Sequence, residues 1–248
     1  MDQETSKPIR ILSLGAGVQS STLLWMMLKG EIERPDHVVF SDTGWEPKAV
    51  YEHLAFLESQ MKEAGIPFHV VSAGNIREDF LADGTHFASM PLYVKNKDGK
   101  DGMARRQCTT KYKLKPLHKK IRELVGLVPW QRSKEVLATV IIGISWDESH
   151  RIKDPIYNWI QNEYPLVDKK ITRQDCIEWS LANGFPRPPR SACIGCPFKN
   201  ADEWRYLKTN PEEWADAVEF DASLRTNVRI RERFRGEAYL HEQRVPLE

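Results

Sequence analysis

Small residues and hydroxyls gather in one segment near the N-terminus, Gly15-Ala16-Gly17-Val18-Gln19-Ser20-Ser21-Thr22. Small side chains let backbone N–H groups approach an anion closely, and the N-terminus of a following helix adds partial positive charge. The segment is not a Walker P-loop, which needs Gly-Lys-Ser/Thr, and Ser20 stands where a Gly-x-Gly-x-x-Gly motif has its third glycine. It predicts a phosphate-binding loop, with a tight turn capped by a serine as the structural alternative.

The chain has four cysteines, two of them in a Cys-x-x-Cys pair at Cys193 and Cys196. Cytoplasmic thiols stay reduced, so metal binding is favoured over disulfides. Four thiolates can hold zinc or an iron–sulfur cluster. We expect Cys108, Cys176, Cys193 and Cys196 to meet around one [4Fe-4S] cluster. A zinc site is the competing interpretation, and a buried apolar thiol is the alternative for Cys176, which lies within a helical pattern.

The elements that must position these residues alternate along the chain. Strand-like apolar runs cover residues 9–14, 37–41, 68–71 and 136–144, and helical patterns cover residues 20–28, 48–64, 114–125 and 172–183. This order predicts a doubly wound α/β fold with a parallel sheet. We expect a nucleotide-binding α/β domain over residues 1–165 and a C-terminal, helical, cysteine-bearing extension over residues 166–248.

Three of the polar segments follow predicted strands. Ligands of open parallel sheets bind in the crevice beyond the carboxyl ends of the strands, so we expect the segments at Gly15, Asp42 and Gly143 to converge. The phosphate contacts would come from Gly17, Gln19, Ser20 and Ser21, and Asp42 would face a ribose or a magnesium ion. The alternatives are that Asp42-Thr43-Gly44 is only a turn and that Asp147 and Glu148 are only a solvated surface.

Four segments then stand in a fixed order: residues 13–22, 40–46 (Phe-Ser-Asp-Thr-Gly-Trp-Glu), 106–117 and 143–151. Together they resemble the phosphoadenosine phosphosulfate reductase family within the N-type ATP pyrophosphatase, or PP-loop, superfamily. The first segment resembles that superfamily's Ser-Gly-Gly-x-Asp-Ser loop and departs from it at Gly15, Ala16 and Gln19. The resemblance covers roughly residues 9 to 200.

The resemblance implies an adenine nucleotide alpha hydrolase-like fold and a set of site residues. Nucleotide-binding residues would be Gly15, Ala16, Gly17, Gln19, Ser20, Ser21, Asp42, Thr43, Gly44, Gly143 and Glu148. Catalytic roles would fall to Asp42, Lys113 and Arg151. The implied cofactors are ATP or a related adenine nucleotide and magnesium, beside the [4Fe-4S] cluster or zinc.

For a member that reduces sulfonucleotides, the resemblance implies a catalytic cysteine near the C-terminus. In this sequence no cysteine follows Cys196. We therefore expect an adenylating transferase that acts at the α-phosphate of ATP and releases pyrophosphate. Its acceptor is unknown, and sulfur transfer is one use of such an adenylate. The alternatives are a sulfonucleotide reductase-like enzyme that uses an external thiol and a non-catalytic nucleotide-binding or metal-stabilised interaction protein.

The composition is that of a globular protein with balanced charge. The 248 residues include 36 Lys and Arg against 35 Asp and Glu, and 41% are hydrophobic. This balance argues against coating nucleic acid by bulk charge, and no run approaches the length of a membrane span. The polar residues 1–8 do not resemble a signal peptide, so we expect a cytoplasmic protein without a membrane partner, and the sequence allows a homodimer. The arginines of residues 225–235 could bind nucleic acid, but a solvated helix paired with nearby acids is preferred.

Overall fold

The computed structural model describes residues 7–82, 90–96, 101–234 and 236–248. They form two compact units. Unit 1 consists of Met1–Ser41, Lys48–Val71 and Pro116–Ser191, and unit 2 consists of Asp42–Pro47, Ser72–Lys115 and Ala192–Glu248. This division differs from the expected boundary at residue 165, because the chain passes between the units several times.

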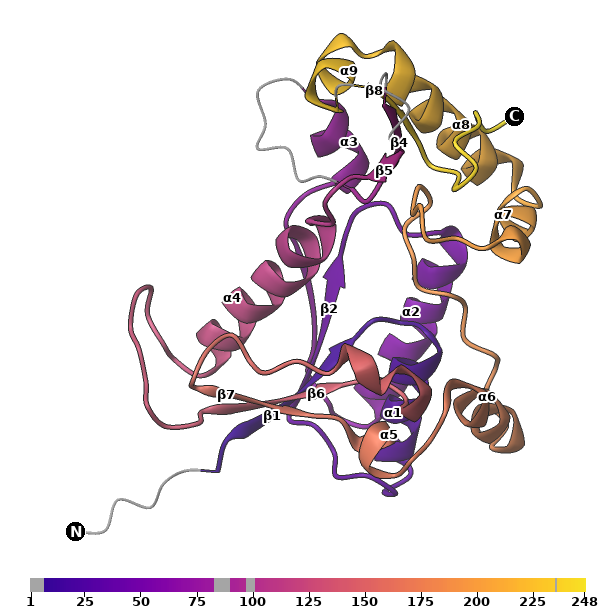
Figure 1. Cartoon of the computed structure of the whole chain (residues 1–248). Helices are drawn as coiled ribbons and strands as arrows, with labels where there is room; N and C mark the ends of the chain where they lie inside the picture. Colours follow the sequence, from indigo (N-terminus) through magenta and orange to yellow (C-terminus); the bar gives the residue numbers. More distant parts are fainter. Residues whose placement is uncertain (1–6, 83–89, 97–100, 235) are drawn as a thin grey trace. The chain divides into compact units, whose positions relative to one another are not determined.

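The centre of unit 1 is a parallel sheet of five strands in the order β3-β2-β1-β6-β7 (Figure 1). The strands are β1 (Ile9–Leu14), β2 (His37–Asp42), β3 (Phe68–Ser72), β6 (Ala138–Ile142) and β7 (Ile160–Glu163). From β1 the chain builds outward through β2 and β3, then returns to the other side of β1 with β6 and β7. This reversal confirms the doubly wound α/β fold and makes the β1–β6 boundary its switch point, where such sheets bind ligands.

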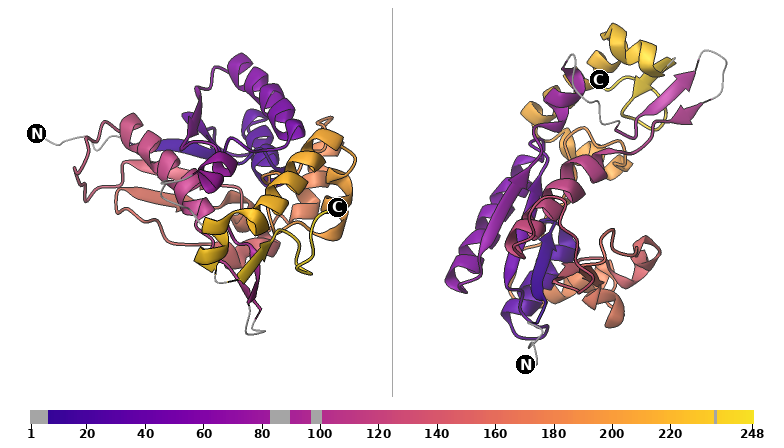
Figure 2. Two further views of the ribbon diagram at one scale, coloured as in Figure 1. Left: turned by 90° about the horizontal axis from the view of Figure 1, so that it is seen from above. Right: turned by 90° about the vertical axis from the view of Figure 1, so that its left-hand side faces the viewer.

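Helices cover both faces of this sheet, because alternate strand residues point to opposite sides. On one face Leu12 and Ile141 join a buried apolar cluster with residues of α1 (Val18–Leu28), α2 (Lys48–Glu63) and α6 (Arg173–Ala182). On the other face Ile11 and Val140 pack with residues of α4 (Lys115–Leu124). Figure 2 shows the same helices beside the sheet from two further directions. The short elements η2 (Trp146–Arg151) and α5 (Pro165–Asp168) complete unit 1.

Unit 2 combines helices with an antiparallel sheet of order β5-β4-β8. Its strands are β4 (Tyr93–Asn96), β5 (Gly102–Met103) and β8 (Gly236–Tyr239), and its helical elements are α3 (Ile76–Leu81), η1 (Thr109–Leu114), α7 (Ala201–Leu207), α8 (Pro211–Thr226) and α9 (Val228–Phe234). The expected helical C-terminal region is therefore present and carries Cys193 and Cys196. Its strand β8 pairs with β4, which comes from the middle of the chain.

Among the described residues, every helix is too short or too polar to cross a lipid bilayer.

Candidate functional site

The predicted phosphate loop lies at the switch point of unit 1, between β1 and α1. Helix α1 begins at Val18, its N-cap is Gly17, and no side chain caps this end. The first turn of the helix carries no acidic residue. This end of the helix therefore keeps its partial positive charge, because no side chain caps it and no acid in the first turn offsets it.

Ser20 braces this loop from within. Its hydroxyl accepts a hydrogen bond from the Gly15 N–H at 3.1 Å and donates to the Gly17 carbonyl at 3.4 Å. Between them Ala16 has φ +53°, in the left-handed region, and its methyl group is buried. A residue with a side chain adopts this conformation at a cost of about 1 kcal/mol. The hydrogen bonds of Ser20 on either side of Ala16 hold the loop in this conformation.

Two other segments of unit 1 approach the loop so closely that an added Cβ would make a tight contact. A Cβ on Gly143, directly after β6, would lie 2.9 Å from both the Cα and the N of Ser20. A Cβ on Gly17 would lie 3.2 Å from the Cβ of Ser191. The predicted proximity of the Gly15 and Gly143 segments is therefore confirmed within unit 1.

The side chain of Gln19 links the loop to the segments after β6 and before α6. Its Nε2 donates to Glu148 Oε2 at 3.0 Å, and its Oε1 accepts from Arg173 NH1 at 2.7 Å. Arg151 forms an ion pair with the same Glu148 carboxylate. Glu148 and Arg151 thus belong to one network with Gln19, which is more than a solvated surface. The network thus holds two guanidinium groups, those of Arg151 and Arg173, near the loop.

Arg173 was not predicted from the sequence, since it lies 154 residues from Gln19 and no motif marks it. It is the first residue of α6, where Thr172 and Asp175 form a capping box. Its N–H donates to Asp147 Oδ1 at 2.9 Å. Although partial burial opposes the effect, hydrogen bonds from Ser145 and from the Arg173 backbone lower the pKa of the Asp147 carboxyl. Asp147 therefore fixes the start of α6 and with it the guanidinium of Arg173.

Ser21 is not placed as predicted. Its side chain is fully buried, and its hydroxyl lies 2.9 Å from Nε2 of His53 on α2. Burial lowers the pKa of His53 to about 4, so the ring is neutral at pH 7. The Ser21 hydroxyl holds α1 to α2, and this arrangement does not support a phosphate contact.

The predicted nucleotide contacts Thr43 and Gly44 lie in unit 2, in a turn with internal partners. Asp42 Oδ1 accepts the Gly44 N–H at 2.8 Å. Gly44 has φ +71°, and a Cβ there would lie 2.9 Å from the Cα of Asn75. Asn75 also donates to the Gly44 carbonyl at 2.9 Å. These contacts agree with the alternative prediction that Asp42-Thr43-Gly44 is a turn.

Glu46 is the centre of a buried polar group in unit 2 that sequence reasoning missed. Its Oε1 accepts the Thr43 hydroxyl at 3.0 Å and lies 3.5 Å from Nζ of Lys113. Burial alone would lower the pKa of the Lys113 amine, but the nearby Glu46 carboxylate has the opposite effect, and the net result is a raised pKa. Thr43 Oγ1 lies 3.2 Å from Cys193 Sγ, and burial together with Glu46 raises the pKa of that thiol to about 12. The sequence signal for Glu46 was its place as the last residue of the 40–46 segment.

The described residues do not fit a site made by all four cysteines. Cys176 on α6 is fully buried in the apolar cluster of unit 1, and burial raises its pKa to about 12. Cys108, Cys193 and Cys196 belong to unit 2. Within the described parts of both units, no three His, Cys, Asp or Glu side chains are grouped so that they could hold a metal ion. The surroundings of Cys176 agree with the alternative prediction that it is a buried apolar thiol.

No protein-family model and no curated relative matches the sequence. Among solved structures, the U34-tRNA thiolase NcsA from Methanococcus maripaludis, with its [4Fe-4S] cluster, is similar with a TM-score of 0.40 and 11% identity. The similarity covers 90% of this chain and 74% of that chain. At this TM-score and identity, the likeness carries no argument about activity, cofactor or substrate.

Proposed function

We propose that unit 1 binds the polyphosphate of an adenine nucleotide and that the protein is an adenylating enzyme. The observation that carries the proposal is the uncapped N-terminus of α1 at the switch point of the sheet, entered through a loop of small residues. The close approach of Gly143 shows that β6 ends directly against this loop. Loop, helix end and switch point together form the usual environment of a bound phosphate in a doubly wound sheet.

The network around Gln19 supplies charge and orientation. Arg151 and Arg173 are guanidinium groups that suit bidentate contact with phosphate oxygens. Glu148 holds Arg151, and Gln19 holds Arg173. In adenylation an acceptor forms a bond to the α-phosphorus while the bond to the bridging oxygen of pyrophosphate breaks. The N–H groups and guanidinium groups of unit 1 would then stabilise the negative charge that develops on the leaving pyrophosphate.

The finer parts of the proposal rest on the sequence resemblance. These are the choice of the α-phosphate, membership of the phosphoadenosine phosphosulfate reductase family and the use of the adenylate for sulfur transfer. Asp42 and Lys113, which unit 2 engages in internal contacts, carry no step of the mechanism. A metal carries no step either.

The experiment combines nucleotide binding with analysis of products. We expect ATP and pyrophosphate to bind, and slow turnover with water as acceptor to yield AMP and pyrophosphate. Gly17→Asp should abolish binding, because it places a carboxylate among the anion-binding N–H groups. Ser20→Ala should weaken binding about tenfold, since the two hydrogen bonds of its hydroxyl within the loop are lost.

Ser59→Ala is the matched control. Its exposed hydroxyl also bonds a backbone carbonyl, that of Phe56 at 2.8 Å, but far along α2. Release of ADP and phosphate would refute action at the α-phosphate, and binding without turnover would refute the enzymatic part. Sulfite release from a sulfonucleotide in the presence of a thiol would favour the reductase alternative.

A further inference from the structure

The loop that joins α4 to β6 in unit 1 presents an indole ring to solvent. Trp130 is 96% exposed, the highest value among the large apolar side chains of the described residues. Buried or half-buried tryptophan is the ordinary case, because the side chain carries a large apolar surface. An indole held almost wholly in water therefore calls for an explanation.

Local hydrogen bonds build the turn that holds Trp130 outward. Gln131 donates its N–H to the Val128 carbonyl at 3.1 Å, and its side-chain Oε1 accepts the Val128 N–H at 3.1 Å. Arg122 on α4 donates to the Gln131 carbonyl at 2.8 Å. Trp130 itself has φ +70°, a left-handed conformation that costs a bulky L-residue about 1–2 kcal/mol. The turn thus keeps the ring in solvent at a cost in backbone strain.

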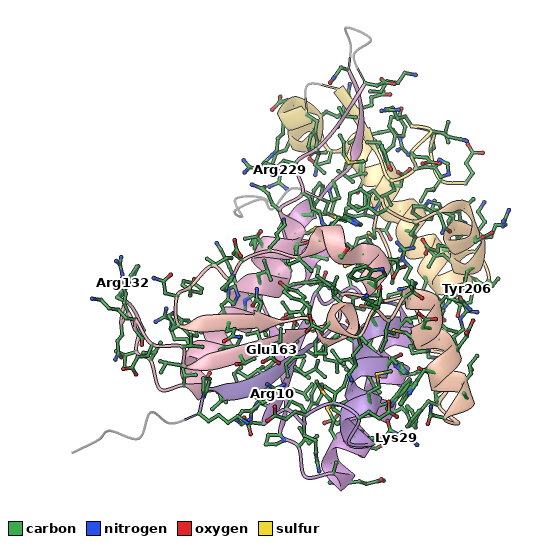
Figure 3. All side chains as sticks on the ribbon, turned by 60° about the horizontal axis from the view of Figure 1, so that its bottom comes forward. Arg10, Lys29, Arg132, Glu163, Tyr206 and Arg229 are labelled. Carbon is green, nitrogen blue, oxygen red and sulfur yellow. The ribbon has the colours of Figure 1, made fainter. Side chains whose placement is uncertain are left out.

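Cationic residues are frequent in the sequence around Trp130. Residues 116–137 contain five Lys or Arg against two Glu, whereas the whole chain is nearly balanced at 36 against 35. One of the two acids, Glu123, is paired with Lys120 at 3.0 Å. Within the described part of the chain, no ion pair engages Lys119, Arg132 or Lys134, and all three are exposed. Figure 3 shows Arg132 at the outer end of the loop, directed away from the sheet.

A second aromatic group continues the surface along α4. The Arg122 guanidinium lies 5.7 Å from the ring centre of Tyr157 and 5.1 Å from that of Trp159. The ring of His118 meets Tyr157 edge-on at 5.2 Å. Tyr157 is 37% exposed. Trp159 is buried, so Tyr157 and Trp130 are the rings of this region that reach solvent, and Arg122 contacts both the Tyr157 ring and the loop of Trp130.

We propose that this surface binds a single-stranded segment of nucleic acid. Trp130 would stack on an unpaired base, and Lys119, Arg132 and Lys134 would contact phosphates. Stacking on an aromatic side chain needs an accessible ring face, and phosphate binding needs cations that are not already paired. A protein partner or a second copy of the chain would be favoured by a continuous apolar patch. Here Val128 at 62% and Val136 at 36% are also exposed, but the exposed cations Arg132 and Lys134 lie between Trp130 and Val136 along the chain. The proposal goes beyond nucleotide binding at Gly17 and does not depend on it.

The test is fluorescence anisotropy with labelled twelve-nucleotide oligouridine, oligothymidine and a duplex of the same length, using the full chain. We expect both single strands to bind more tightly than the duplex. Trp130→Ala should weaken single-strand binding about 5- to 150-fold, the range of one stacked base. Arg132→Gln combined with Lys134→Gln should weaken it and lower the slope of log affinity against log salt by about 1.4. The ratio of the RNA and DNA affinities then identifies which nucleic acid is preferred.

Matched controls separate this proposal from general effects. Tyr206→Ala removes another exposed ring, 69% exposed, in unit 2, and should bind oligonucleotides as the unmodified protein does. Lys29→Gln combined with Lys62→Gln removes two exposed charges elsewhere in unit 1 with the same expectation. ATP affinity and thermal stability should be unchanged in Trp130→Ala, so failure here is distinguishable from failure of the nucleotide site. Unchanged single-strand binding in Trp130→Ala, tighter duplex binding, or loss of a dimer in Trp130→Ala without oligonucleotide binding would each overturn the proposal.

Discussion

Replacement of Gly143 by alanine tests the packing of β6 against the phosphate loop. The added Cβ would lie 2.9 Å from the N and the Cα of Ser20 and 3.2 Å from the carbonyl carbon of Gln19. An ordinary contact between carbon atoms is about 3.5–4.0 Å, so the loop must retreat by about 0.6–1 Å. All the opposing atoms belong to the backbone, so no side chain can rotate to relieve the contact.

Two magnitudes follow from this displacement. Overpacking of this kind costs about 1–3 kcal/mol, and each kcal/mol lowers Tm by about 2–4 °C for a chain of this length. The same shift moves the Ser20 N–H away from a bound phosphate. Loss of one hydrogen bond to a charged group costs about 1.5–3 kcal/mol, which corresponds to about 10- to 150-fold in Kd for pyrophosphate.

Calorimetric titration with pyrophosphate and a thermal melt measure both quantities. Gly15→Ala is the control for stability, because its Cβ would meet only the Ser20 hydroxyl, at an ordinary 3.6 Å. Gly102→Ala in β5 is the control for binding, since its nearest neighbour would be 4.0 Å away. The reasoning is refuted if Gly143→Ala binds pyrophosphate as the unmodified protein does and melts at the same temperature.

Three further predictions concern buried polar and packed groups. The pKa of His53 is about 4 in the folded protein and 6.5 in the unfolded chain, so the unfolded chain binds a proton first as the pH falls. The free energy of unfolding should therefore be constant above pH 6.5 and fall by about 3 kcal/mol between pH 6.5 and pH 4. Chemical denaturation measures this loss, which His53→Leu should lack. Gly195→Ala would bring a Cβ to 2.1 Å from the Trp45 ring, so we expect the free energy of unfolding of unit 2 to fall by about 2–3 kcal/mol, the upper range for overpacking. Limited proteolysis should then be faster in the variant, and equal rates would contradict this prediction. Asp221 is fully buried and accepts hydrogen bonds from Arg225 at 2.8 Å and from two backbone N–H groups. Asp221→Ala should lower the free energy of unfolding by about 3–5 kcal/mol, because the Arg225 charge loses its buried partner. A thermal melt measures the loss, and an unchanged Tm would show that the ion pair is replaceable.

The fold was predictable where apolar residues repeat with a clear period. The helical pattern at residues 48–64 corresponds to α2 at Lys48–Glu63, and the pattern at residues 172–183 corresponds to α6 at Arg173–Ala182. The strand β7 was not predicted, since in Ile-Gln-Asn-Glu only Ile160 is buried. A short strand at the edge of a sheet has one partner and little apolar surface, so its sequence carries a weak signal.

The site was predictable as a loop but not as a network. Small residues between a strand and a helix identified Gly15–Gly17, because that requirement is local. The direction of a hydroxyl depends on the packing of helices, so Ser20 and its neighbour Ser21 could not be told apart in advance. The pairing of Gln19 with Arg173 depends on the packing of α6 beside α1, and the burial of Cys176 has the same origin.

Hydrogen–deuterium exchange with and without ATP tests the central claim most directly, because it locates the ligand along the chain. We predict slower exchange of the amides in residues 15–22 when ATP is present, with no change at residues 126–137. Protection elsewhere in the chain without protection of residues 15–22, or no protection at saturating ATP, would contradict the assignment of the phosphate loop.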